Sequence, residues 1–311
     1  MDDPAPPSPE VLAGPFRMPR QMLADQSYAG HASVHDESTA ADLGLAGAPI
    51  EGPTHFSQFD PLLASLWGED WFAHGWLSSH FQTMVVEGEE VQATVTVPAP
   101  GSTTVRVDAA KADGTPVLTG TASIDGDASA TELAPRLASM RESPPGRLHI
   151  LDRISVGQRG SGDETVTVGF DDDFGEMYPF SLTDKLAAIT EPLDWYRSGA
   201  DTPWGAPIVP IEMLSVLTNA GSRYAGFVAR QPSIGLFIDL EVRLLGSPVL
   251  VGHAYRIDRE VVALGESRRT ESYWTLTTLT HDDTGVPTAQ VLLHQGVFKD
   301  SYSGYPHEET A

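Results

Sequence analysis

Residues 31–59, HASVHDESTAADLGLAGAPIEGPTHFSQF, form the stretch that decides the fold. They place histidines among acids, then a turn of small residues, and then an apolar-periodic segment that begins at His55. A related stretch, WGAPIVPIEML at residues 204–214, recurs in the second half of the chain. Two helix starts of the same design predict two similar modules.

A helix is predicted over residues 55–66, with Thr54 as its N-cap. Its apolar residues recur at spacings of three and four, which lines them up on one face: Phe56, Phe59, Leu63 and Leu66. That face should be buried. The repeat predicts a second such helix over residues 211–219, where Ile211, Leu214 and Leu217 are spaced by threes.

Strands dominate the remainder of both modules. Residues 91–97 alternate apolar and polar side chains, as a sheet covered on one side requires, and the Asp113-Gly114 turn leads into a strand over 116–124. In the second module we expect strands over 165–170, 234–245, 248–257, 271–279 and 287–297, with a turn at 281–285. Short helices are predicted over 17–29 and 133–140 and from a cap at Ser181 or Thr183 to Ile189.

The expected organisation is a flexible tail over residues 1–14, a first module over 15–125, a linker over 126–147, a second module over 148–300 and a tail over 301–311. A chain of 311 residues with 41% hydrophobic content can bury one large core or two ordinary ones, and the repeat favours two.

Composition narrows the possible functions. The net charge of -24 disfavours nucleic acid and anionic membrane surfaces as partners, although a few arginines could still bind a phosphate. The absence of cysteine excludes disulfides, thiolate catalysis and sulfur-ligated metals. Neither a secretory signal nor an apolar run of ~20 residues is present, so we expect a cytoplasmic protein.

The residues around His35 resemble a known motif. His35, then Ala41, then Pro49-Ile50 resemble the hydratase motif of the MaoC-like branch of the hotdog superfamily. Residues 85–91, VVEGEEV, resemble the strand pair that follows the helix in that family. Residues 190–196 (TEPLDWY) and 203–208 (PWGAPI) are similar to the degenerate repeat of its double-hotdog members, with Tyr196 in the place of the histidine.

The resemblance implies an α+β double hotdog, in which each antiparallel sheet wraps a long central helix and the two sheets pair edge to edge. It implies an active site between the modules and hydration of a 2-enoyl thioester, or the reverse dehydration. In that family an Asp and a His handle the water, and a backbone N–H at the helix start polarises the thioester carbonyl. Gly52 is in position to supply that N–H.

The motif is incomplete in this chain. Gly30 stands where the family has its Asp, Ala32 where it has Asn, and Ser33 where it has Pro. Histidine can still act alone as a base, since its unperturbed pKa of ~6.5 lies near working conditions. A second carboxylate, if one is needed, has several candidate sources: Asp36, Glu37 and Glu51 nearby, and Asp194 from the second module.

Plainer interpretations stay open for several residues. His31 and His55 fit structural roles, and together with His35 and Glu51 they match no metal-ligand spacing, so we expect no metal and no other cofactor. An aromatic cluster after the first helix fits core packing or a substrate tunnel: Trp67, Trp71, Phe72 and Trp76. The densest arginines fit ion pairs or phosphate contacts: Arg256, Arg259, Arg268 and Arg269.

The sequence therefore predicts a hydratase or dehydratase, a carbon–oxygen lyase, that acts on a small acyl thioester or related carbonyl compound with His35 as acid–base group. A hotdog thioesterase and a non-catalytic acyl-binding partner subunit are the alternatives. We expect a homodimer that binds a small-molecule substrate.

Overall fold

The computed structural model of this chain describes residues 10–26, 33–160 and 164–306. The first module comprises β1 (Val11–Ala13), α1 (Glu37–Asp42), the 3-10 helix η1 (Gly52–Gln58), α2 (Asp60–Trp67), α3 (Glu69–His74), β2 (Trp76–Phe81), β3 (Val91–Thr96), β4 (Thr104–Lys111) and β5 (Pro116–Ser123). The linker carries the short η2 (Ala128–Ala130) and α4 (Leu133–Glu142). The second module comprises β6 (Glu164–Thr167), α5 (Leu182–Ala188), η3 (Asp194–Tyr196), α6 (Met213–Asn219), η4 (Ser222–Tyr224), β7 (Gly235–Leu244), β8 (Ala254–Glu266), β9 (Thr270–His281), β10 (Pro287–Phe298) and η5 (Lys299–Ser301).

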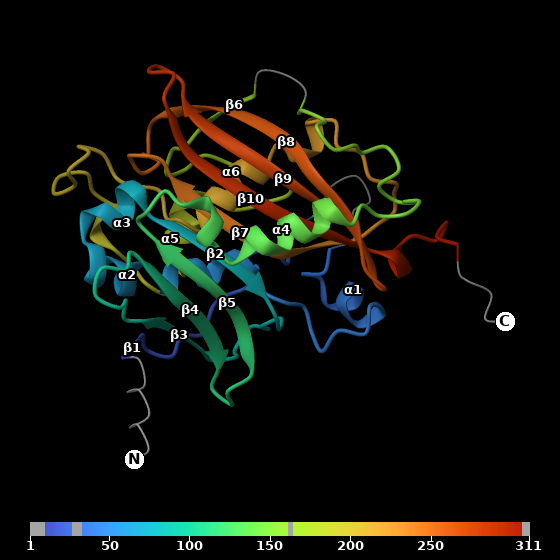
Figure 1. Cartoon of the computed structure of the whole chain (residues 1–311), viewed down its shortest axis with the longest axis horizontal. Coiled ribbons are helices and arrows are strands. Elements are labelled where there is room, and N and C mark those ends of the chain that lie inside the picture. Colours follow the sequence, from blue (N-terminus) through green and yellow to red (C-terminus); the bar gives the residue numbers. More distant parts are fainter. Residues whose placement is uncertain (1–9, 27–32, 161–163, 307–311) are drawn as a thin grey trace, which may run out of the picture.

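The ten strands of the described residues join one sheet in the order β1-β3-β4-β5-β2-β7-β10-β9-β8-β6 (Figure 1). The two modules meet at β2 and β7, which pair antiparallel from Trp76 opposite Arg243 to His80 opposite Asp239. Because this pairing closes the free edge of each module's sheet, the two sheets continue into each other edge to edge. This is the arrangement that the resemblance implied.

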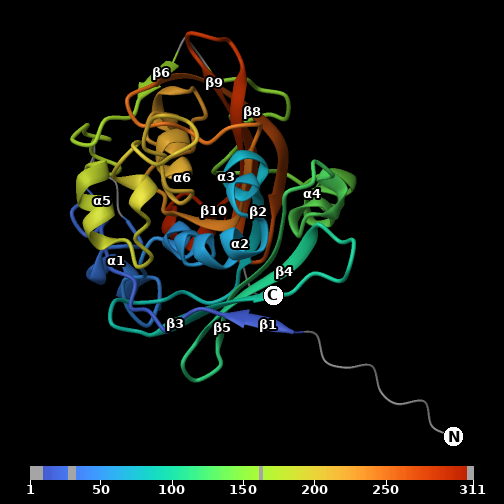
Figure 2. The same ribbon diagram turned by 90° about the vertical axis from the view of Figure 1, so that its left-hand side faces the viewer.

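The helices lie on both faces of the sheet. Figure 2 shows α2, α3, α5 and α6 on one side, whereas the linker helix α4 lies on the other. Every residue of α6 is buried, and Phe56, Phe59 and Leu63 of the first central helix region are fully buried. Among the described residues, no helix has the length and apolar character that crossing a bilayer requires.

The core is shared between the modules, in contrast to the two cores that the repeat favoured. One hydrophobic cluster contains Phe59 and Leu77 of the first module together with Leu217 and Val242 of the second. Leu77 lies directly opposite Val242 across the β2–β7 pairing, and neither side chain is exposed. The continuous sheet therefore carries one core through both modules.

The first central helix differs from its prediction. It starts at Gly52 as a 3-10 helix, with Glu51 as N-cap, and becomes α-helical only at Asp60. Pro61 has no N–H to donate to an upstream carbonyl, so a continuous α-helix through this point would lack a hydrogen bond. Thr54 lies inside the 3-10 helix and is not its cap.

Other boundaries are also corrected. The tail prediction over 1–14 is wrong for Val11–Ala13, which pairs with β3 and forms β1, an edge strand of the sheet. No helix forms over residues 17–26, where Arg17 bridges Val91 instead, and residues 27–29 lie outside the described residues. The strand predicted over 248–257 begins at Ala254, since Gly252 adopts a positive φ in a turn. In the C-terminal tail, Tyr302 and Tyr305 pack against a small hydrophobic cluster.

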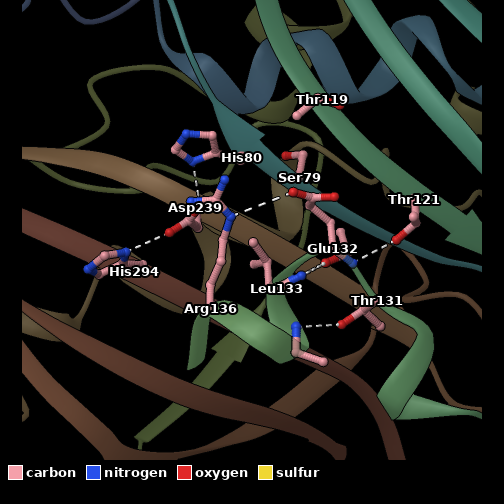
Figure 3. A network of polar contacts seen from close by, with 12 residues as sticks. Ser79, His80, Thr119, Thr121, Thr131, Glu132, Leu133, Arg136, Asp239 and His294 are labelled. Carbon is pink, nitrogen blue, oxygen red and sulfur yellow. Dashed lines mark hydrogen bonds and ion pairs between the residues drawn. The ribbon is translucent and has the colours of Figure 1, made fainter. Parts of the chain in front are cut away.

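A polar network lies on the outer face of the sheet, beneath α4 (Figure 3). Asp239 on β7 accepts hydrogen bonds from Nδ1 of His80 on β2 at 2.7 Å and from Nδ1 of His294 on β10 at 2.6 Å. The hydroxyl of Ser78 on β2 accepts from the backbone N–H of Leu133 at the start of α4. The network thus ties both modules and the linker helix together at the β2–β7 pairing.

Candidate functional site

A cavity of about 590 Å³ lies on the inner side of the sheet and is lined by both modules. Its volume is in the range typical of small-molecule sites. The first module contributes, among others, Val34, His35, Glu51, Gly52, His55 and Phe81. The second contributes, among others, Asn219, Phe227, Tyr273, Leu293 and Gln295.

The His35 ring is held in one tautomer. Its Nδ1 lies 2.7 Å from the Pro49 carbonyl oxygen, which can only accept, so Nδ1 carries the proton and donates. The ring makes no other hydrogen bond within the described part of the chain, which leaves the Nε2 lone pair free. Burial lowers the pKa of His35, although the Pro49 hydrogen bond and the charge of Glu51 oppose this shift. The imidazole is therefore neutral near pH 7 and has a basic nitrogen.

Gly52 combines a free backbone donor with a tight contact. It is the first residue of η1, and its N–H makes no hydrogen bond among the described residues, as expected at a helix start. A Cβ atom at this position would lie 3.1 Å from Cε1 of Phe81. A glycine here lets the Phe81 ring, another lining residue, pack against the helix start.

Glu51, which precedes this donor, is buried in an ionic cluster. Its Oε2 accepts a hydrogen bond of 3.0 Å from Nζ of Lys185 on α5, and Lys185 Nζ also lies 3.1 Å from Oε1 of Glu212. Burial alone would lower the pKa of Lys185, but Glu212 and Glu51 outweigh burial and raise it. Burial raises the pKa of Glu212. The Oε1 atom of Glu51 is buried and has no hydrogen-bond partner.

Burial shifts the pKa values of two side chains on the first central helix region, His55 and Asp60, toward their neutral forms. Burial lowers the pKa of His55 to about 4, and its nearest polar contact is Nε2 of Gln58 at 3.4 Å. Burial raises the pKa of Asp60 to about 7. Asp60 accepts from the Tyr196 hydroxyl and, at 2.9 Å, from Nε1 of Trp71. Asp60 and Tyr196 thus connect the two modules, on residues that do not line the cavity.

The second module contributes an uncharged polar network to the cavity wall. Asn219 donates to the hydroxyl of Tyr178 at 3.0 Å and accepts from Nε2 of Gln295 at 3.2 Å. Gln295 in turn accepts from the Tyr273 hydroxyl. This network gives the second module's side of the cavity amide and phenol groups.

The structure brings together three of the predicted site residues, His35, Glu51 and Gly52. Asp36 is exposed and caps α1, where its carboxylate accepts from the N–H of Thr39. Asp194 is exposed at the start of η3, and Tyr196 is buried against Asp60. None of these three lines the cavity. His31, Gly30 and Ala32 lie outside the described residues.

Lys185 and Glu212 are the site components that the sequence analysis missed. Glu212 had only a weak signal, because it comes four positions after Ile208 of the repeated Gly-Ala-Pro-Ile segment, whereas Glu51 directly follows Ile50. For Lys185 no local motif exists.

The plainer interpretations hold for several other residues. Trp71, Phe72 and Trp76 are core residues, and neither they nor Trp67 line the cavity. Arg259 lines the cavity but is ion-paired with Glu164, and Arg256 lies 4.0 Å from Asp282. Within the described ranges, no group of three or more His, Asp or Glu side chains is arranged to hold a metal ion.

Comparisons with known proteins agree with this architecture. No protein-family model and no curated protein matches the sequence. Among solved structures, a putative MaoC domain protein dehydratase from Chloroflexus aurantiacus J-10-fl is similar, with a TM-score of 0.56 and 14% identity over 93% of this chain and 95% of that one.

A conserved hypothetical protein of Mycobacterium tuberculosis, Rv0216, described as having a double hotdog fold, is also similar. Its TM-score is 0.57 and its identity 14%, over 94% of this chain and 97% of that one. At such identities the likeness concerns the fold. The chain therefore has a double-hotdog fold.

Proposed function

We propose that this chain is a hydratase or dehydratase that acts on a small acyl thioester or a related carbonyl compound, with His35 as the acid–base group. The observation that carries the proposal is the His35 ring in the cavity. Its Nδ1–H donates to the Pro49 carbonyl, so Nε2 is the basic atom. Gly52 lines the same cavity, and its free N–H is the donor that we assign to a substrate oxygen.

In the hydration direction, Nε2 of His35 takes a proton from a water molecule while the water oxygen bonds to C3 of the enoyl group. The electron pair of the C=C bond moves toward the carbonyl, and the oxygen of the resulting enolate gains negative charge. The Gly52 N–H stabilises that charge by hydrogen bonding. The protonated His35 then returns its proton to C2, and dehydration is the reverse sequence.

Glu51 is the carboxylate that we assign to this reaction. It lines the cavity with His35, whereas Asp36 and Asp194 do not. The Oε1 atom of Glu51 lacks a partner, and a buried carboxylate oxygen without a donor costs free energy. A hydrogen bond from the reacting water to Oε1 would satisfy that atom and orient the water toward His35.

The test is hydration of crotonyl-CoA, followed as the loss of the enoyl absorbance. Wild type should turn over, and His35→Ala should lower kcat by ~10²–10⁴-fold, the usual contribution of a general base. His74→Ala is the matched control, since His74 lies on α3 away from the cavity. A wild type without thioester turnover, or a fully active His35→Ala protein, would contradict the proposal.

A thioesterase is the second candidate, and the unpartnered Oε1 of Glu51 favours it, because a carboxylate can activate water for attack on the thioester carbonyl. Release of free thiol from acyl-CoA substrates, lost in Glu51→Gln and retained in His35→Ala, would identify this activity instead. The homodimer and the cytoplasmic location stay predictions, and light scattering of the purified chain tests the former.

A further inference from the structure

The ionic cluster behind Glu51 joins the starts of the two central helix regions. Glu51 precedes η1 in the first module and Glu212 precedes α6 in the second. Each follows a Gly-Ala-Pro-Ile segment, and both segments form an isolated bridge, Pro49 with Val86 and Ile208 with Leu250. The two carboxylates each directly precede their central helix region, although Glu51 comes one position and Glu212 four positions after the segment, and one lysine contacts both.

Lys185 is placed for this contact by its helix. It lies on α5, which a capping box at Ser181 and Asp184 starts, and only 1% of the residue is exposed. Its Nζ donates to Oε2 of Glu51 and, at 3.3 Å, to Oγ1 of Thr54. Glu212 adds an ion pair, with its Oε1 at 3.1 Å from Nζ, but no hydrogen bond.

The cluster holds two carboxylates and one ammonium away from water. A buried carboxylate is strongly disfavoured in its charged form unless a cation compensates it. Lys185 is the cation in contact with Glu51, and it engages only Oε2. The other oxygen, Oε1, is buried without a hydrogen-bond partner, as are both carboxylate oxygens of Glu212.

We propose that Lys185, a second-module residue, is a positioning residue for the candidate site: it holds the Glu51 carboxylate of the first module through Oε2, so that Oε1 accepts a hydrogen bond from the reacting water or a substrate hydroxyl. This inference rests on the proposed function, since it gives Glu51 a role in that reaction. It makes the proposed reaction in the cavity depend on residues of both modules.

The chain's lack of cysteine allows a precise test. In Lys185→Cys the only thiol is alkylated in the unfolded chain. Alkylation with 2-bromoethylamine gives the S-aminoethyl protein, which has an ammonium at nearly the length of lysine. Alkylation with 1-bromopropane gives the S-propyl protein, which has a neutral side chain of similar size. Wild type taken through the same unfolding, alkylation and refolding is the procedural control. Lys111→Met, which removes a lysine paired with Glu89 away from the cavity, is the control for loss of an ion pair.

The kinetic readout is kcat and KM with an enoyl thioester. The S-propyl protein should lose ~10²-fold or more in kcat with a small change in KM, because a reacting group would no longer be held in its orientation. The kcat of the S-aminoethyl protein should lie within a few-fold of the wild-type value. Full activity of the S-propyl protein, or no rescue by the S-aminoethyl group in a folded protein, would overturn the proposal. If the S-propyl protein does not fold, the same pair is compared in the Glu212→Gln background, where one buried carboxylate fewer needs compensation.

A second readout does not depend on turnover. The pKa of His35, measured by NMR titration of the imidazole, should fall both in the S-propyl protein and in Glu51→Gln, because a Glu51 carboxylate that is no longer held in place, or is removed, favours the charged ring less. Removal of a cation beside an unchanged Glu51 would raise that pKa, and an unchanged or raised value would overturn the proposal. If wild type hydrates no thioester but His35 follows the charge at position 185, the proposed reaction fails and the positioning role stands.

Discussion

One imidazole sets the pH range of the proposed reaction. Burial lowers the pKa of His35, so the basic form is already present at neutral pH. We expect kcat/KM to increase with pH through a value below ~6.5, the ordinary pKa of histidine, and then to level off. The measurement is kcat/KM for crotonyl-CoA hydration from pH 5 to 8.5, and an acid limb centred above pH 7 would contradict the assignment of His35.

A pair of substitutions at Gly52 separates the loss of its N–H from the effect of adding a side chain. Both Gly52→Ala and Gly52→Pro place a Cβ against Phe81, but only proline lacks the N–H. Proline is acceptable at the first position of a helix. We expect Gly52→Pro to lower kcat by ~10²–10³-fold relative to Gly52→Ala, the effect of losing one oxyanion donor. Equal kcat values for the two variants would show that this N–H does not contact the reacting oxygen.

The site residues that lie close together in the sequence could be predicted, and those far apart in the sequence could not. His35, Glu51 and Gly52 lie in one short stretch, and local spacing was enough to select them. Lys185 is 134 positions from Glu51, and nothing in its own neighbourhood distinguishes it from a surface lysine. The motif comparison also selected Asp194 and Tyr196, but the fold directs these residues away from the cavity. Such contacts depend on how the modules pack, which residue spacing does not encode.

At the scale of elements, the N-cap of α5 controls the position of Lys185. The Ser181 hydroxyl accepts from the N–H of Asp184, while the Asp184 carboxylate accepts from the N–H of Ser181. Ser181→Ala should lower the free energy of unfolding by ~1 kcal/mol. It should also lower kcat as α5 frays.

The matched control is Ser139→Ala, the same substitution at an exposed interior position of α4, where alanine should be neutral or slightly stabilising. Urea unfolding gives both free energies. Equal values for the two variants would contradict a role for the cap.

The elements that the sequence predicted well are those with one buried face. In the structure, β3 alternates buried and partly buried residues, and Leu214 and Leu217 are both buried on α6. Ser181 caps α5, one of the two caps predicted. β2 was not predicted as a strand, because its first four residues are all buried and show no alternation. A strand inside a continuous sheet with both faces covered loses that signal.

At the scale of the whole molecule, one sheet and one main core predict cooperative unfolding. Each module carries three tryptophans, so tryptophan fluorescence reports on both modules, and circular dichroism reports on the sheet. We expect the two probes to give coincident thermal transitions. Asp239→Asn should lower Tm without splitting the transition, since it weakens a buried hydrogen-bonded network that joins the modules at the β2–β7 pairing. Two separate transitions in wild type would mean that the modules fold independently.

The burial of the Asp60 carboxyl group should make stability depend on pH. Burial raises the pKa of Asp60 from 3.8 to about 7, so the folded state binds this proton more tightly than the unfolded state does. The resulting stabilisation is complete below the unfolded pKa and is lost as the pH increases through about 7. Its full size is up to about 4 kcal/mol, at 1.36 kcal/mol for each unit of pKa difference.

Two variants isolate this effect from other titrating groups. Asp60→Asn abolishes the titration, yet an asparagine can accept from Trp71 and donate to the Tyr196 oxygen. The Tm of wild type relative to Asp60→Asn should therefore be highest near pH 4 and decrease steadily to pH 8. Tyr196→Phe removes a hydrogen bond that lowers the pKa of Asp60, so in that variant the decrease should continue to higher pH. A Tm difference between wild type and Asp60→Asn that is constant with pH would show that Asp60 has the same proton affinity in the folded and unfolded chain.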